Sequence, residues 1–295
     1  MTASNRVMFK GMLLAATILA SPLIAAAPIP AVAQIAITLS VQTAPPMLPV
    51  YAQPPMPGAG YIWTPGYWHW SQRVGYYWVP GTWVLPPSVG MLWTPPYWGW
   101  DNGAYVFHAG YWGPQVGYYG GINYGYGYGG TGYEGGRWDG GNFDYNRTVN
   151  NFGSVPATHV YEQTVTAGNS SRVSYAGGAS GLKAAPTEVE RSAEHDQHVP
   201  VTQQQTKHVA AAVRTPVLAA SRNKGRPAIA ATSRPAQFKG PGVVRAQPAG
   251  AGERAASPPV QRRPAAQNAA PRAAPAREPA AEPAREQRPE QRPER

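Results

Sequence analysis

The chain contains no cysteine, which excludes disulfides, thiol catalysis and cysteine metal sites. It also has little charge in its first half, where residues 34–160 carry three basic and four acidic side chains. They are Arg73, Arg137, Arg147, Asp101, Glu134, Asp139 and Asp144. The four carboxylates form no paired pattern for acid–base chemistry, and a G-x-S-x-G nucleophile motif is absent. We therefore expect no enzymatic activity, no cofactor and no metal site.

Long apolar runs are absent after residue 33, and the one near the N-terminus resembles an export signal. Arg6 and Lys10 precede the apolar residues 11–27, and Ala31-Val32-Ala33 forms an A-x-A cleavage site. The alternative, a retained membrane anchor, is disfavoured by Ser21-Pro22 inside the apolar run. We expect residues 1–33 to be a signal peptide, which predicts export to the periplasm, the outer membrane surface or the extracellular space.

What the chain has in abundance is tryptophan at a fixed spacing. Trp63, Trp78 and Trp93 lie 15 residues apart, and Trp68, Trp83 and Trp98 keep the same step. The units alternate in type, so the true period is about 30 residues, with two strands and a polar turn in each period. The predicted turns are residues 71–73 and 101–103. This pattern predicts an all-β fold, a small antiparallel sheet built from aromatic hairpin repeats in residues 58–117.

A Pro-Gly step lies between the two tryptophans of a unit. Residues five apart in a regular strand face opposite sides, so Trp63 and Trp68 share a side only if a bulge or kink at Pro65-Gly66 adds a residue. The third unit has Pro96 instead of glycine, and proline cannot adopt positive φ. The fourth unit has Phe107 where tryptophan is expected. We expect these two units to be less regular.

These residues resemble a known family. The segments Tyr61-Ile-Trp-Thr-Pro-Gly-Tyr-Trp68, Tyr76-Tyr-Trp-Val-Pro-Gly-Thr-Trp83 and Val106-Phe-His-Ala-Gly-Tyr-Trp112 are similar to bacterial YXWGXW (WXXGXW) repeat proteins. The resemblance implies export, an all-β repeat and no catalytic activity. The repeat signature consists of Trp63, Gly66, Trp68, Trp78, Gly81, Trp83, Trp93, Trp98, Gly110 and Trp112.

Other segments flank the repeat block. Residues 34–57 predict a short strand followed by a proline-rich linker. Residues 118–180 are a glycine- and tyrosine-rich run followed by further strands. Residues 181–214 contain two capping-box patterns and predict marginal helices near 187–198 and 202–213. Residues 215–295 are rich in alanine, proline and arginine and predict a disordered basic tail.

A cluster of histidines in the segment 181–214 could form a metal-binding site. His195 and His198, with Glu194 and Asp196 beside them and His208 beyond, could ligate an ion. No second ligand pair has the spacing of a structural site, so we interpret the segment as solvated and polar. His69 and His108 lie inside repeat units, where we expect them to fill a face of the sheet rather than bind metal.

The aromatic stripe has two interpretations. The repeat tryptophans can form the core of the sheet, because aromatic side chains fit a pleated surface and bury a large area. Alternatively, Tyr67, Trp70, Tyr97 and Trp100 form a platform on the other face that stacks on sugar rings.

The tail concentrates the positive charge, with 20 basic and 11 acidic residues between 161 and 295. It is either a solubilising spacer or an electrostatic contact to anionic surfaces. The expected partners are envelope polysaccharide, an anionic lipid surface or another envelope protein. Self-association is a further possibility, and we expect no binding of nucleic acid. The sequence thus favours a non-enzymatic structural or interaction protein of the cell envelope, with a carbohydrate-binding module as the alternative.

Overall fold

The computed structural model describes residues 39–156 and 158–247. The expected signal peptide, residues 34–38 at the start of the segment predicted to hold a short strand, and the tail beyond residue 247 lie outside the described residues. The described residues belong to one unit by their contacts. None of their helices is long and apolar enough to cross a membrane.

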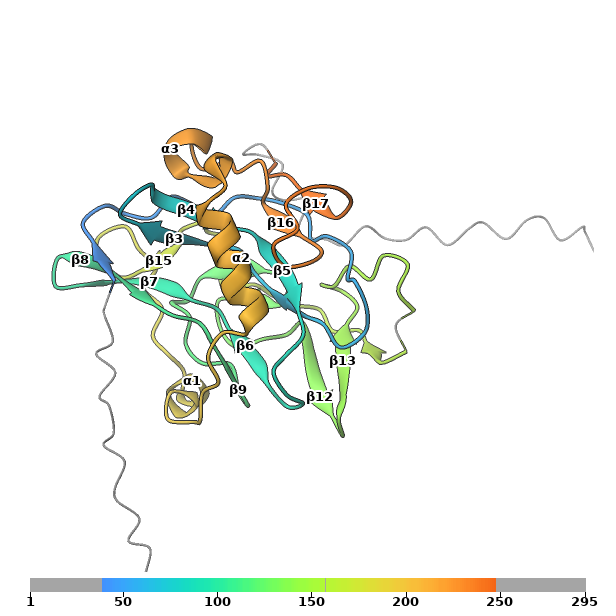
Figure 1. The fold of residues 1–295 in the computed structure, drawn as a ribbon. Coiled ribbons are helices and arrows are strands. Elements are labelled where there is room, and N and C mark those ends of the chain that lie inside the picture. The colour runs from blue at the N-terminus through green and yellow to red at the C-terminus, as the bar shows by residue number, and fades with distance from the viewer. Residues whose placement is uncertain (1–38, 157, 248–295) are drawn as a thin grey trace, which may run out of the picture. The chain divides into compact units, whose positions relative to one another are not determined.

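Most of the regular structure consists of short strands (Figure 1). The strands are β1 (Ser40–Val41), β2 (Ile62–Thr64), β3 (Tyr67–Ser71), β4 (Gly75–Val79), β5 (Gly81–Val84), β6 (Leu92–Thr94), β7 (Tyr97–Asp101), β8 (Ala104–His108), β9 (Tyr111–Gly113), β10 (Asn123–Gly125), β11 (Tyr128–Gly129), β12 (Gly136–Asp139), β13 (Asn142–Asn146), β14 (Val160–Tyr161), β15 (Tyr175–Ala176), β16 (Ala231–Thr232) and β17 (Val243–Val244). The helices are α1 (Glu188–Ala193), α2 (Gln203–Val213), the 3₁₀ turn η1 (Pro216–Leu218) and α3 (Ala220–Asn223). The prediction of small antiparallel sheets made of aromatic hairpins is confirmed.

Each 30-residue period forms one bent hairpin. In the first hairpin, β3 pairs with β4 around the turn after Ser71, and β2 pairs with β5 beyond the bend. In the second hairpin, β7 pairs with β8 and β6 pairs with β9 in the same way. The cross-strand partners are Trp63 with Trp83, Trp68 with Trp78, Trp93 with Trp112 and Trp98 with Phe107. The strands break at Pro65-Gly66, as the spacing predicts, so that Trp63 and Trp68 are both buried.

The second hairpin packs against the edge of the first. The indole Nε1 of Trp98 donates a hydrogen bond of 2.8 Å to the carbonyl oxygen of Trp68 in β3. The ring of Phe107 lies against His69, with a centroid separation of 4.7 Å. Together these contacts let the hairpins share one core.

The proline-rich residues 45–57 are part of this core rather than a spacer, which corrects the linker predicted at 34–57. Leu48, Tyr51, Gln53 and Met56 are buried. The extended chain has unpaired carbonyl groups, and two of them accept indole N–H groups: Met47 from Trp68 at 3.1 Å and Pro54 from Trp83 at 2.9 Å. Carbonyl groups of this segment are free for this role because the segment makes few backbone pairs of its own.

The glycine–tyrosine run packs on the repeats through its tyrosines. The β10–β11 hairpin spans Asn123 to Gly129, and Tyr119, Tyr124 and Tyr128 are buried. The hydroxyl of Tyr128 donates to the carbonyl of Trp93 at 2.9 Å, and that of Tyr124 donates to Pro96 at 2.6 Å. Packing on the hairpins therefore compensates for the entropy cost of the glycines.

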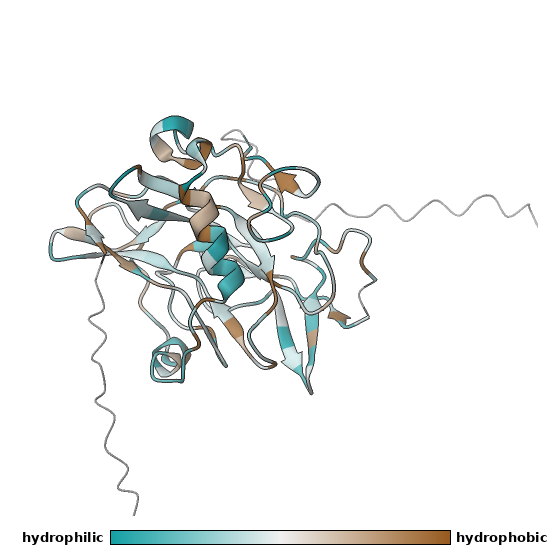
Figure 2. Cartoon of the chain, in the orientation of Figure 1, coloured by the Kyte–Doolittle hydropathy of each residue, from teal (hydrophilic) through white to brown (hydrophobic). Residues whose placement is uncertain are grey.

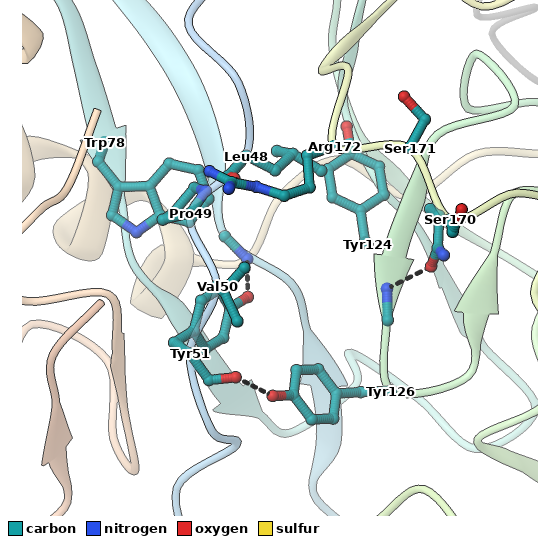
Figure 3. Close-up of a pocket in the computed structure, with 13 residues that line it drawn as sticks. Leu48, Pro49, Val50, Tyr51, Trp78, Tyr124, Tyr126, Ser170, Ser171 and Arg172 are labelled. Carbon is teal, nitrogen blue, oxygen red and sulfur yellow. Dashed lines mark hydrogen bonds between the residues drawn. The ribbon is translucent and has the colours of Figure 1, made fainter. Parts of the chain in front are cut away.

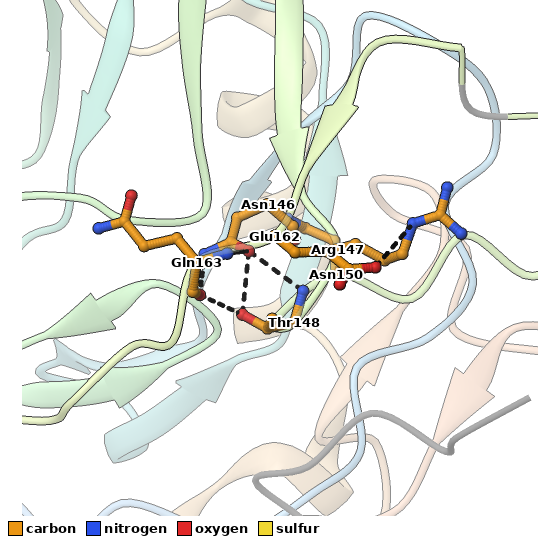
Figure 4. Close-up of polar contacts among 6 residues, drawn as sticks. All are labelled: Asn146, Arg147, Thr148, Asn150, Glu162 and Gln163. Carbon is orange, nitrogen blue, oxygen red and sulfur yellow. Dashed lines mark hydrogen bonds and ion pairs between the residues drawn. The ribbon is translucent and has the colours of Figure 1, made fainter. Parts of the chain in front are cut away.

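A buried asparagine joins the next strands. The side chain of Asn146, at the end of β13, donates to the carbonyl of Gln163 and accepts from the backbone N–H groups of Thr148 and Gln163 (Figure 4). It also donates to the carbonyl of Glu134. These bonds hold the parallel pairing of β13 with β14. The ion pair between Arg147 and Glu162 beside it is exposed, with 3.9 Å between nitrogen and oxygen, and contributes little.

Both predicted capping boxes form. Thr187 caps α1 with Glu190, and Thr202 caps α2 with Gln205. The helix α2 is supported by tertiary contacts, because the side-chain oxygen of Gln205 accepts the indole N–H of Trp112 at 2.8 Å and α2 packs on β4 (Figure 1). Helix propensity alone would leave such a short helix marginal.

Residues 215–247 differ from the sequence-based expectation. They were expected to begin a disordered tail, yet they contain η1, α3, β16 and β17. The strand β16 pairs in parallel with β5, and Ala230, Ala231 and Thr232 are fully buried. The segment is tied to the first hairpin, because the indole Nε1 of Trp78 donates a hydrogen bond of 2.9 Å to the carbonyl oxygen of Ala230.

The core is aromatic more than aliphatic. In Figure 2 the repeat strands are mostly pale, since tryptophan and tyrosine lie near the middle of the hydropathy scale. The strongest hydrophobic colour lies on isolated residues instead. Burial of tryptophan thus replaces the leucine and isoleucine core of a typical small domain.

Candidate functional site

All seven signature tryptophans are buried. Their exposed fractions do not exceed 3 %; the residues are Trp63, Trp68, Trp78, Trp83, Trp93, Trp98 and Trp112. Cross-strand pairs pack edge to face, with centroids 5.3 Å apart for Trp63 and Trp83 and 5.2 Å for Trp68 and Trp78. The signature is therefore a packing motif at the centre of the fold.

The signature glycines make room for these rings. A Cβ atom at Gly81 would lie 2.6 Å from Cζ2 of Trp63, and one at Gly110 would lie 2.5 Å from Cζ2 of Trp93. At Gly66 it would overlap Cζ2 of Trp78 and lie 2.8 Å from the backbone nitrogen of Gly81. None of these three glycines has positive φ. The kink thus requires glycine for close approach, not for a left-handed backbone.

The third and fourth repeat units are as regular as the first two, which corrects the expectation that they are less regular. Strands β6 to β9 pair in the same register as β2 to β5. Pro96 occupies the position of Gly66, and Phe107 occupies the position of the Trp78 ring that covers Gly66. A phenyl ring is smaller than an indole, so we interpret the two departures from the repeat as compensating each other.

Replacing Gly66 with alanine is expected to destabilise the protein by about 1–3 kcal/mol, because the added methyl group displaces Trp78 and the Gly81 backbone. The matched control is Gly58→Ala, since a Cβ atom there would meet only Tyr61, at 3.7 Å or more. Urea unfolding followed by circular dichroism measures both. Equal stabilities of the two variants would contradict the close-approach role of Gly66.

The candidate platform residues occupy different environments. Tyr67 and Trp70 are half-buried, Tyr67 against Phe107 and Trp70 against Tyr76. Trp100 is the one tryptophan with an exposed side chain, at 39 %. Tyr97 and Trp100 line a common hollow, which Tyr67 and Trp70 do not reach. A single four-residue platform is therefore not present.

The hollow beside β7 has a volume of about 430 Å³. On one side Tyr97 stacks on His108, with ring centroids 4.3 Å apart and planes 3° from parallel. Gly99 lies beside this stack and has no side chain to fill the space. The equivalent position in the first hairpin is occupied by His69. Asp101 and Lys183 supply a carboxylate and an ammonium group to the lining. An aromatic wall with one acceptor and one donor is suited to a polar ring such as a sugar.

Burial lowers the pKa of His108, and the nearby carboxylates of Glu194 and Asp101 oppose this shift. The neutral imidazole is therefore favoured for stacking on Tyr97. Burial also raises the pKa of the Tyr97 hydroxyl well above its ordinary value, with Tyr118 and Glu194 adding to the shift. The hollow is thus lined by neutral aromatic groups at neutral pH.

Two of the candidate metal-ligating histidines, His198 and His208, have structural contacts, whereas His195 is exposed. His198 stacks on Tyr111 at a centroid distance of 3.6 Å, and its Nε2 lies 2.8 Å from the carbonyl oxygen of Ala193. His208 is buried between the carbonyl of Pro80 and the backbone N–H of Ala236. Within residues 39–156 and 158–247, no group of three or more His, Cys, Asp or Glu side chains is placed to hold a metal ion.

Sequence reasoning missed most of the hollow. Tyr118, Gly99 and residues 182–185 belong to its lining. Of the lining residues, the sequence predicts a role in ligand binding only for Tyr97 and Trp100. The parallel pairing of β15 with β7, which brings residues 176–185 beside the second hairpin, leaves no local signal in the sequence.

Comparison with known proteins agrees with the repeat pattern. The WXXGXW repeat family matches two segments, residues 58–84 and 89–112, and each segment corresponds to one bent hairpin. No curated protein and no solved structure matches the chain. The chain is thus a protein with two copies of the WXXGXW repeat.

Proposed function

We propose that this chain is an exported, non-enzymatic interaction protein of the bacterial cell envelope, in which the tryptophan repeats form the scaffold. The observation that carries the proposal is the burial of all seven signature tryptophans. Because the buried tryptophans cannot contact a partner, we expect partners to bind the surfaces around the hairpins. Export to the periplasm, the outer membrane surface or the extracellular space rests on the A-x-A signal pattern and the lack of cysteine.

The proposed partners are envelope polysaccharide, an anionic lipid surface or another envelope protein, and a second copy of the chain. The basic tail supports the anionic partners, because its excess of lysine and arginine attracts polyanions over about a Debye length. Nucleic acid remains outside the proposal, since export separates the chain from it.

A second candidate function is carbohydrate binding at the hollow beside β7. It is favoured by the Tyr97–His108 stack beside the bare Gly99 and by Asp101 and Lys183 in the lining. The stack offers a flat ring face, and the two charged groups can accept and donate hydrogen bonds to hydroxyl groups. This site replaces the four-residue platform as the place where sugar would bind.

Calorimetric titration with cell-wall oligosaccharides tests this second function. Asp101→Ala and Lys183→Ala are each expected to weaken binding about tenfold, because each removes a charge-assisted hydrogen bond. Lys207→Ala, an exposed lysine on α2 outside the hollow, is the matched control and should bind like the unmodified protein. Unchanged affinity in both hollow variants would remove the hollow from consideration while leaving the scaffold proposal intact.

A further inference from the structure

A second pocket lies against the kink of the first hairpin, on elements separate from the hollow. It has a volume of about 140 Å³ (Figure 3). Gly66 and Trp78 of the hairpin form part of its lining, together with residues 48–51, residues 123–126 and the loop 170–172. We refer to it as the kink pocket.

Arg172 is the charged residue of the kink pocket. Its side chain is half-buried, and its Nε donates a hydrogen bond of 2.8 Å to the carbonyl oxygen of Leu48. Within the part of the chain that the structure describes, the two terminal guanidinium nitrogens have no hydrogen-bond partner and no carboxylate forms an ion pair with them. A half-buried guanidinium with free N–H groups is a ready partner for a carboxylate or phosphate group.

Part of the remaining wall is aromatic. Tyr51 lies 5.8 Å from Tyr126 between ring centroids and 6.2 Å from Trp78. The Tyr126 hydroxyl donates to the carbonyl of Tyr51, and the Tyr51 oxygen accepts from the Gly66 N–H at 3.3 Å. Tyr126 is half-buried and supplies accessible ring surface, whereas Tyr51 and Trp78 are almost fully buried. Exposed Ser170 supplies a hydroxyl at the rim.

From this combination we propose that the kink pocket binds a sugar ring that carries an anionic substituent, a carboxylate or a phosphate. The anionic group would pair with the guanidinium of Arg172, and the ring would lie against the tyrosine walls. The inference does not depend on the hollow beside β7, because the two sites share no residue.

Titration of the purified full chain tests the proposal, with glucuronate, glucose 6-phosphate, glucose, acetate and inorganic phosphate as probes followed by NMR. At least one of the two anionic sugars is expected to bind about tenfold more tightly than glucose, acetate or phosphate. The two anionic sugars distinguish carboxylate from phosphate. Acetate and phosphate report non-specific binding to the basic tail, and either one binding as tightly as the sugars would overturn the proposal.

Two variants assign the binding to the pocket. Arg172→Gln removes the charge, and Ser170→Trp obstructs the rim while leaving the Arg172–Leu48 bond in place. Both are expected to weaken binding of the anionic sugar about tenfold or more, whereas Arg147→Gln, which removes an exposed arginine elsewhere, should have no effect. Equal affinities of Ser170→Trp and Arg147→Gln would overturn the assignment, even if Arg172→Gln failed to fold.

Discussion

Replacing Trp83 with alanine is expected to destabilise the protein by about 3–5 kcal/mol, the range for removing a large aromatic side chain from a packed core. Trp83 is fully buried, packs edge to face with Trp63 and donates its indole N–H to the carbonyl of Pro54. The substitution leaves a cavity and an unpaired carbonyl group in the segment that covers the first hairpin. Urea unfolding followed by circular dichroism measures the loss.

The matched control for this prediction is Trp100→Ala. Trp100 has the same side chain in the equivalent hairpin, but 39 % of it is exposed. Its loss is expected to cost clearly less stability than the loss of Trp83, because a large part of the Trp100 side chain already faces solvent. If the two variants lost similar stability, the division between scaffold tryptophans and surface tryptophans would be wrong.

Acidification is expected to destabilise the protein through His208. Its Nδ1 accepts the backbone N–H of Ala236 at 2.7 Å, so Nε2 carries the proton and donates to the carbonyl of Pro80 at 2.8 Å. Burial lowers the pKa of His208 to about 4. Since folding favours the neutral imidazole, this stabilisation is complete above pH 6.5 and is lost as the pH falls from 6.5 toward 4. The loss amounts to about 3 kcal/mol.

Unfolding free energies measured between pH 7.5 and pH 4 test the role of His208, with His208→Gln as the variant and His195→Gln as the control. The decrease should be much smaller in His208→Gln, because glutamine does not titrate. His195 is exposed, so His195→Gln controls for the histidine-to-glutamine change itself. A steep decrease that persists in His208→Gln would assign the acid sensitivity to other groups.

The sequence was most informative where the interactions are local or repeated. The tryptophan period predicted both hairpins and their turns, because cross-strand pairing follows directly from spacing around a turn. The capping boxes at Thr187 and Thr202 also formed as predicted, since each involves residues only three apart.

Long-range packing was less predictable. The proline-rich residues 45–57 have the composition of a linker, and their role became apparent only where their carbonyl groups meet the indoles of Trp68 and Trp83. Residues 215–247 lack periodic apolar residues, yet β16 adds to β5 across about 150 residues of chain. Trp78 donates its indole N–H to the carbonyl of Ala230 beside β16, a contact that neither segment reveals alone.

The candidate binding sites were predictable only in part. Tyr97 and Trp100 were identified from their place in the repeat, whereas Lys183 and Arg172 come from loops brought in by long-range contacts. The signature residues themselves were found in full, but their burial could not be read from spacing, because an aromatic stripe suits a core and a binding face equally well.

The central claim is that the repeat tryptophans are scaffold and not a binding surface. Acrylamide quenching of tryptophan fluorescence, with and without cell-wall polysaccharide, tests it most directly, because all ten tryptophans lie between Trp63 and Trp138. We predict weak quenching that comes from Trp100 and, to a smaller extent, from the half-buried Trp70 and Trp138, so that Trp100→Ala reduces it and polysaccharide leaves the quenching of the signature tryptophans unchanged. Strong quenching of the Trp100→Ala variant that polysaccharide suppresses would show that the signature tryptophans face a ligand, and would contradict the claim.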